Sequence, residues 1–222
     1  MIWWSHLSAL GGFDITAPVA LTIAAWLASA RCWRLALTWC ALFCVAMTLA
    51  AGSQMAFIGW GLGIESLAFT GFSGHATRAA AVYPVALFLL LEKRERRWRR
   101  VAVLAGVILA VGVAAARVKI GAHAISEATA GCLLGLCAAA MFITSTRTTG
   151  SDAPRPVVLG LLAIVLLLPR GDALNTHQWV TAAALKLSGH DRIFMAHNWQ
   201  RAQTPYSPPC ARERVRFSYL CT

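Results

Sequence analysis

Residues 35–58, LALTWCALFCVAMTLAAGSQMAFI, contain no Asp, Glu, Lys, Arg or His. A helix needs about 20 predominantly apolar residues to cross the hydrocarbon core of a bilayer, and this stretch is long enough. It therefore predicts a membrane-spanning helix. The composition of the whole chain agrees, because 58% of its 222 residues are hydrophobic, 13% are charged and the mean hydropathy is +0.62. These values lie outside the usual range of soluble domains.

Further apolar stretches on both sides predict an all-α, polytopic transmembrane helix bundle of about six spans, which occupies residues 1–170. The stretches are residues 15–30, 35–58, 76–91, 101–116, 124–144 and 156–170. The third and fourth need flanking residues to reach the length of a span. The sixth is short, since its apolar part lies between Pro156 and Pro169. Both a full crossing and a re-entrant segment remain open for it.

Basic residues gather in alternate loops, at Arg31–Arg34, Glu92–Arg100 and Arg147–Arg155. The positive-inside rule makes these loops cytoplasmic. This distribution also explains the net charge of +11 better than nucleic-acid binding does. We therefore expect a multi-pass protein of a bacterial inner membrane, with residues 71–78 and 117–123 on its periplasmic face.

Residues 171–222 form a C-terminal tail that is more polar and richer in proline than the bundle. We expect this tail to be periplasmic, with a partly amphipathic helix at residues 177–187 on the membrane surface. Cys210 and Cys221 would then lie in an oxidising compartment, where they could form a disulfide. The other cysteines do not have the spacing of a zinc site with a histidine, so neither a metal nor another cofactor is expected.

Two short polar segments beside the apolar stretches carry the candidate functional residues. They are Gly71–His75, GFSGH, and Arg117–Glu127, RVKIGAHAISE. Ionisable groups next to hydrocarbon cost on the order of a few kcal/mol unless they are paired or functional. One helical hairpin separates the two segments, and short connections favour antiparallel neighbours. We therefore expect the two segments to meet on one side of the membrane.

The second segment resembles the third signature of the type 2 phosphatidic acid phosphatase superfamily, in which Arg117 precedes His123 and His123 precedes Glu127. Ser73-Gly74-His75 resembles the second signature, and the resemblance covers roughly residues 60–140. It includes glycines at three further positions, Gly121, Gly131 and Gly135. Two of these glycines also have the small-xxx-small spacing of closely packed helices, and we prefer this structural role for them.

The resemblance implies a role for each residue. His123 would be the nucleophile that forms a phosphohistidine, and Glu127 would hold its other ring nitrogen. The i to i+4 spacing of this pair independently puts both side chains on one helical face. His75 would protonate the leaving group and later activate water. Arg117, Ser73 and the backbone amides of Gly74 and His75 at a helix N-terminus would bind the phosphate.

The first signature of that family, a lysine followed by six residues and Arg-Pro, is not recognisable. Residues 59–72, where it would lie, contain no Lys or Arg. Arg78 and Lys119 are the candidates to replace its cations, although the sequence does not reveal the direction of either side chain. Glu127 stands where aspartate is usual.

The expected function is therefore metal-independent hydrolysis of a lipid phosphate or diphosphate, with membrane lipids as partners and without nucleic acid. The identity of the lipid and the oligomeric state stay open. An inactive lipid-binding or scaffold protein on the same fold is an alternative, because the first signature is missing. A rhomboid-like intramembrane serine protease is a further alternative, because Gly71-Phe72-Ser73-Gly74 matches the Gly-x-Ser-Gly pattern and His123 could be its histidine.

Overall fold

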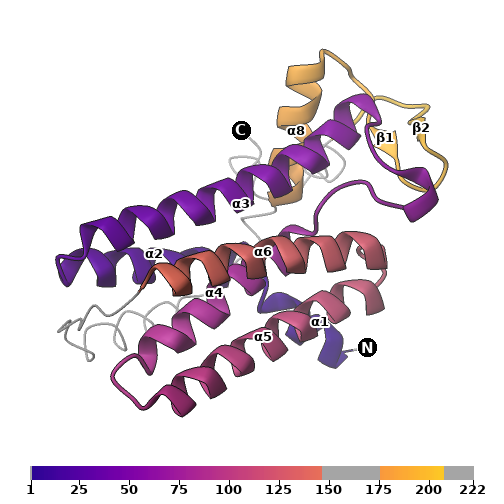
Figure 1. Ribbon diagram of the computed structural model, residues 1–222. Helices are drawn as coiled ribbons and strands as arrows, with labels where there is room; N and C mark the ends of the chain where they lie inside the picture. The colour runs from indigo at the N-terminus through magenta and orange to yellow at the C-terminus, as the bar shows by residue number, and fades with distance from the viewer. Residues whose placement is uncertain (1, 147–175, 208–222) are drawn as a thin grey trace, which may run out of the picture. The chain divides into compact units, whose positions relative to one another are not determined.

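The computed structural model describes residues 2–146 and 176–207 (Figure 1). The contacts within the chain define two compact units. The first unit comprises residues 1–50 and 72–169, and the second comprises residues 51–71 and 170–222. The first unit contains both motif segments apart from Gly71, so it is the one that positions the candidate site.

Helix α4, Gly74–Leu90, packs against both α5, Arg96–Lys119, and α6, Ile125–Ser145 (Figure 1). Small residues allow these backbones to approach closely. A Cβ atom at Gly135 of α6 would collide with the carbonyl oxygen of Thr77 in α4. A Cβ atom at Gly106 of α5 would lie 2.6 Å from the Cα atom of Pro84. The close helix packing predicted from the glycine spacing in α6 is thus confirmed.

Four segments of the described chain are long and apolar enough to cross a membrane: Ile2–Ser29, Trp33–Trp60, Arg96–Lys119 and Ile125–Ser145. The first consists of α1, Ile2–Ala9, and α2, Phe13–Ser29, and the second is α3. Helix α4 is shorter than the about 20 residues of an ordinary span, and it contains the buried Arg78. The predicted all-α, multi-pass fold is confirmed, while the sixth predicted stretch, residues 156–170, lies outside the described residues.

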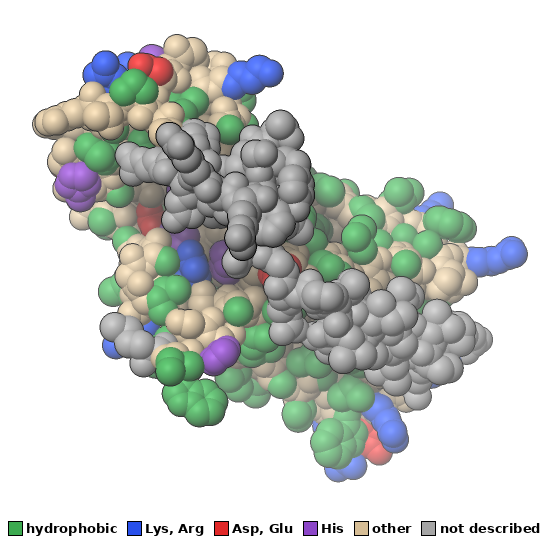
Figure 2. Space-filling view, turned by 180° about the vertical axis from the view of Figure 1, so that it is seen from behind, with side chains coloured by type: hydrophobic (Ala, Val, Ile, Leu, Met, Phe, Trp, Pro, Cys, Tyr) green, Lys and Arg blue, Asp and Glu red, His purple; other side chains and the backbone are tan. Residues whose placement is uncertain are grey.

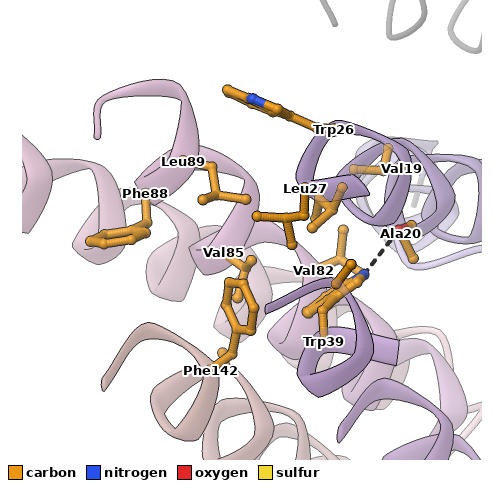
Figure 3. Packing of buried hydrophobic residues seen from close by; sticks show 13 residues of the cluster. Val19, Ala20, Trp26, Leu27, Trp39, Val82, Val85, Phe88, Leu89 and Phe142 are labelled. Carbon is orange, nitrogen blue, oxygen red and sulfur yellow. Dashed lines mark hydrogen bonds between the residues drawn. The ribbon is translucent and has the colours of Figure 1, made fainter. Parts of the chain in front are cut away.

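A hydrophobic core forms where α2, α3, α4 and α6 meet (Figure 3). Trp39 of α3 is 1% exposed, and its ring packs edge-on against Phe142 of α6 with a centroid distance of 5.5 Å. Its indole N–H donates to the backbone oxygen of Ala20 at 2.9 Å. This bond satisfies the polar atom that a buried tryptophan brings into an apolar core. The same core buries Val82 and Val85 completely and so holds α4 in place.

Helix α1 precedes the first predicted span and was not anticipated from the sequence. It packs against α5, and residues 10–12 connect it to α2. This connection approaches the start of α4 closely, because a Cβ atom at Gly11 would lie 2.9 Å from the carbonyl oxygen of His75. The same atom would lie 2.7 Å from Cγ1 of Val113 in α5. The α1–α2 connection therefore belongs to the end of the bundle that carries the motif segments.

The helix ends separate the motif segments from the basic loops. Helix α4 begins and α5 ends at the motif end of the bundle, whereas residues 91–95 connect these helices at the opposite end. Figure 2 shows many hydrophobic side chains on the surface of the molecule. Many large apolar side chains are exposed there, including Leu21, Leu37, Val45, Leu104, Ile108 and Leu133. Such a surface suits contact with lipid hydrocarbon.

The second unit includes the last turns of α3. Phe57 of α3 packs edge-on against Trp199, with ring centroids 4.9 Å apart. Helix α8 covers residues 177–187, for which the sequence predicted a helix. Cys210 and Cys221 lie outside the described residues. The full bounds of α8 are Thr176–Ser188. The other described elements of this unit are the short 3-10 helix η1, Glu65–Leu67, and two paired antiparallel strands, β1, Phe194–Met195, and β2, Gln200–Arg201.

Candidate active site

His123 lies in the connection between α5 and α6, and Glu127 lies in the first turn of α6. The Oε2 atom of Glu127 is 2.8 Å from Nδ1 of His123 and accepts a hydrogen bond from the amide of Ala124 at 3.1 Å. The carboxylate therefore caps α6 while it orients the imidazole. Because an ionised carboxylate only accepts, Nδ1 carries the proton of this bond. The lone pair of the neutral ring is then on Nε2.

The first turn of α6 is bound to the start of α4. The amide of Ser73 donates to the carbonyl oxygen of Glu127 at 3.1 Å. One turn further along α6, a Cβ atom at Gly131 would lie 2.7 Å from the carbonyl oxygen of Ser73. The two motif segments therefore touch, although a helical hairpin separates them in the sequence.

Ser73 occupies the N-cap position of α4, but its hydroxyl makes no capping hydrogen bond. A serine in this position ordinarily accepts a bond from an amide of the first helical turn. Its Oγ atom is fully buried and has no hydrogen-bond partner among the described residues. A buried polar atom without a partner costs about 1–3 kcal/mol. The hydroxyl is thus an unused donor and acceptor at the start of α4.

Arg78 lies one turn into α4 and is only 7% exposed. Its Nε donates to the carbonyl oxygen of Gly11 at 3.2 Å, and its NH2 lies 3.3 Å from Nδ1 of His75. A guanidinium can only donate, so Nδ1 of His75 accepts this bond. The other ring nitrogen, Nε2, is then the one available to exchange a proton with a ligand. The NH1 atom of Arg78 lies beside Gly74, where an added Cβ would be 3.3 Å away.

Arg117 supplies a second guanidinium from the last turn of α5. Its NH1 donates to Oγ of Ser8 in α1 at 3.2 Å, whereas its buried Nε has no partner among the described residues. The carbonyl oxygen of Arg117 accepts from the amides of Ala122 at 3.0 Å and His123 at 3.3 Å. These main-chain bonds fix the position of His123 relative to the end of α5.

The side chains of His75, Arg78, Arg117 and His123 are close enough to interact electrostatically. His75 interacts with the other three, and Arg78 also interacts with Arg117 and with the carboxylate of Asp14. Two guanidinium charges that are partly withdrawn from water repel each other, and this repulsion is relieved by an anion placed between them. The arrangement therefore suits a ligand with several negatively charged oxygens.

Comparison with known proteins agrees with this chemistry. A family model described as the PAP2 superfamily matches residues 58–151, the range that contains both motif segments. An uncharacterized 22.5 kDa protein in the cps region of Klebsiella pneumoniae is 35% identical over 167 residues, which cover 75% of this chain and 80% of that protein. The chain belongs to the PAP2 superfamily. The predicted family is thereby confirmed, and membership supports a phosphatase or phosphoesterase activity. No solved structure matches the chain.

The structure distinguishes the two cations that were considered as replacements for the first PAP2 signature. Arg78 is buried beside His75 and interacts with Arg117. Lys119, although it also lies in the last turn of α5, has an exposed side chain. The predicted site residues from Ser73 to Arg78 therefore lie close to Arg117, His123 and Glu127. Lys119 is exposed instead.

Two contributors to this PAP2 site were missed by sequence reasoning. They are Ser8, which accepts from Arg117, and the carbonyl group of Gly11, which accepts from Arg78. Both precede residues 58–151, the range that the PAP2 model matches. The Gly11-Gly12 pair is a local sequence signal that another part of the chain packs closely there. The pair does not indicate which part of the chain that is.

The geometry does not support the protease alternative. A serine nucleophile needs a hydrogen bond to its histidine. Within the described chain Ser73 Oγ has no such partner, and Nδ1 of His123 is bound to Glu127. The protease pattern also leaves Arg117, His75 and Glu127 unexplained.

Proposed function

We propose that this PAP2 protein hydrolyses a lipid phosphate or diphosphate through a phosphohistidine on His123, at the periplasmic face of a bacterial inner membrane. The observation that carries the proposal is that two of the three buried side-chain polar atoms without partners in the described chain, Ser73 Oγ and Arg117 Nε, lie at the motif end of the bundle. The third, Arg99 Nε, lies at the opposite end of α5. Buried polar atoms are ordinarily paired. Ser73 and Arg117 belong to the segments that hold the two histidines, so a phosphate bound there would supply their missing partners.

In the first step the Nε2 atom of His123 attacks phosphorus, and an N–P bond forms as the P–O bond to the leaving group breaks. Glu127 supports this attack, because its carboxylate stabilises the positive charge that develops on the ring. Arg78 and Arg117 stabilise the negative charge on the equatorial oxygens. The amides at the N-terminus of α4 add donors that have no acceptor within the helix.

In the second step water attacks the phosphorus of phosphohistidine, the N–P bond breaks and inorganic phosphate leaves. His75 is the group proposed to exchange protons in both steps. For this Nδ1 of His75 must carry a proton, so the NH2 group of Arg78 leaves Nδ1 and turns to the phosphate. The doubly protonated ring then gives its Nε2 proton to the leaving oxygen in the first step, and Nε2 of the resulting neutral ring removes a proton from water in the second. The positive charge that this chemistry requires comes from two guanidinium groups, so independence from metal ions is part of the proposal.

The choice of a lipid substrate rests on the surroundings of the site. The site lies at one end of a bundle whose outer surface exposes many large apolar side chains. A substrate anchored in the same bilayer would bring its headgroup to this depth without leaving the membrane. The periplasmic side follows from the basic residues Lys93–Arg100 at the opposite end of the bundle, which the positive-inside rule places in the cytoplasm.

The test uses the full-length protein purified in detergent, with EDTA present, and measures inorganic phosphate. The substrates are phosphatidic acid, phosphatidylglycerol phosphate, a polyprenyl diphosphate and a lipid A phosphate. We expect release from at least one of them, and we expect His123→Ala to abolish it. The matched control is His197→Ala, which removes an exposed histidine of the tail and should leave the rate unchanged.

An inactive lipid-binding protein is the second candidate, because residues 59–72 lack the cations of the first family signature. It makes a different prediction in the same experiment. The folded protein would bind the lipid phosphates, and it would release no phosphate from any of them. That result would overturn the proposed catalytic function and leave the phosphate-binding site intact.

A further inference from the structure

Helix α1 touches the candidate site through one of its faces. Ser8 accepts a hydrogen bond from NH1 of Arg117, and Gly11, just beyond the helix, accepts one from Nε of Arg78. Ser8 is 4% exposed. Both arginines that are proposed to hold the phosphate are therefore bound to this N-terminal segment, which lies before the part of the chain that the PAP2 model matches.

The same helix has a hollow with apolar walls. A pocket with a volume of about 460 Å³ is lined, among the described residues, by Trp3, Trp4, His6, Leu7 and Leu10. Pockets that hold small organic ligands have volumes of about 300–1,000 Å³ and mostly apolar linings. The two tryptophan side chains are not buried within the protein, since Trp3 is 85% exposed and Trp4 is 38% exposed. They are therefore available to contact a ligand.

The pocket and the site share α1, because Leu7 and Leu10 of the pocket also pack against the buried cluster that contains Ala76 and Ala114. Leu7 is adjacent in sequence to Ser8, which holds Arg117. An α-helix with its side chains is about 10–12 Å across, so the pocket lies within roughly one helix diameter of that guanidinium. A molecule with a phosphate between the arginines and a hydrocarbon chain could occupy both places at once. A water-soluble phosphate ester could occupy only the first.

We propose that the α1 pocket binds the hydrocarbon chain of the substrate whose phosphate lies between Arg78 and Arg117. This inference rests on the proposed function and adds to it the part of the protein that selects a lipid. The bonds from Ser8 and Gly11 tie the pocket to the two guanidinium groups, so chain binding and phosphate binding share one rigid segment.

The test compares a long-chain substrate with a water-soluble one. The variants are Trp3→Ala and Trp4→Ala, singly and together, because Leu7 and Leu10 also pack against the buried core and their replacement would disturb folding. For a long-chain phosphatidic acid we expect KM to rise roughly tenfold in the double variant, as expected for loss of burial of two large aromatic side chains. For p-nitrophenyl phosphate, kcat/KM should change less than twofold.

The matched control is Trp33→Ala, which removes a 61% exposed tryptophan at the start of α3, outside the pocket. It should change neither substrate's kinetics. Equal losses for both substrates, or no loss for either, would overturn the pocket assignment and leave the tryptophans as interfacial anchors. Failure of the proposed function itself is distinguishable, because the unmodified protein would then release phosphate from neither compound.

Discussion

Replacing Arg78 by lysine tests the proposal that Arg78 replaces a phosphate-binding cation of the missing first signature. Arg78 makes two directed contacts, from Nε to Gly11 and from NH2 to His75, at 3.2 and 3.3 Å. Lysine keeps the charge, but its single nitrogen cannot serve Gly11, His75 and a phosphate together. The loss of one charge-assisted hydrogen bond of about 1.5–3 kcal/mol corresponds to roughly 10- to 150-fold.

The measurement has two parts, both on purified protein in detergent. We expect kcat/KM for a phosphate ester to fall by about 10- to 150-fold in Arg78→Lys, and the inhibition constant of orthovanadate to rise in the same direction. Arg96→Lys, an exposed residue at the far end of α5, serves as the matched control and should alter neither value.

A purely structural role for Arg78 gives another pattern. Its bond to Gly11 would then only hold the α1–α2 connection in place. Arg78→Lys would lower the melting temperature of the protein but would leave the inhibition constant of orthovanadate unchanged. Inhibition within twofold of the unmodified protein, measured on a variant that is still folded, would refute the assignment of Arg78 to the phosphate site.

Two further predictions concern the contacts that hold the site together. Glu127→Gln keeps the shape of the side chain but removes the charge that supports His123, so kcat should fall by about 10- to 150-fold, the effect of one charge-assisted hydrogen bond, while KM changes little. A variant with unaltered kcat would show that the 2.8 Å contact between Glu127 and His123 has no role in catalysis. Gly131→Ala inserts a Cβ atom 2.7 Å from the Ser73 carbonyl oxygen, so thermal unfolding should show a loss of about 1–3 kcal/mol. Gly52→Ala in α3, where nothing lies within 4 Å, should instead stabilise by about 0.5–1 kcal/mol; equal effects of the two substitutions would contradict the close packing of α6 on α4.

The positions of the long helices could be predicted because hydrophobic runs of sufficient length have few alternatives in a membrane. Residues 35–58 predicted a helix that the structure extends to Trp33–Trp60, with the differences confined to its ends. Helix α1 was missed because it is too short to read as a span and mixes Trp, Ser and His without a clear period. Its position depends on packing against α5, which no local pattern reports.

The candidate site divides in the same way. The His123–Glu127 pair follows from a spacing of four residues on one helix, so local geometry was enough. The partners of the arginines could not be predicted, because Arg78 and Gly11 are 67 residues apart and Arg117 and Ser8 are 109 apart. Contacts of this kind depend on how the helices pack, and so does the exposure of Lys119. The contact of Arg78 with His75 is different, because the two residues are three apart on α4.

The central claim is that the phosphoryl group passes through Nε2 of His123, and trapping the intermediate tests it directly. The protein is mixed with a substrate labelled in the transferred phosphate and quenched in base, where the N–P bond of phosphohistidine survives, and the labelled peptide is identified. We predict a label on His123 in the unmodified protein and none in His123→Asn. Phosphate release that persists in His123→Asn, or a label on Ser73 instead, would contradict the account.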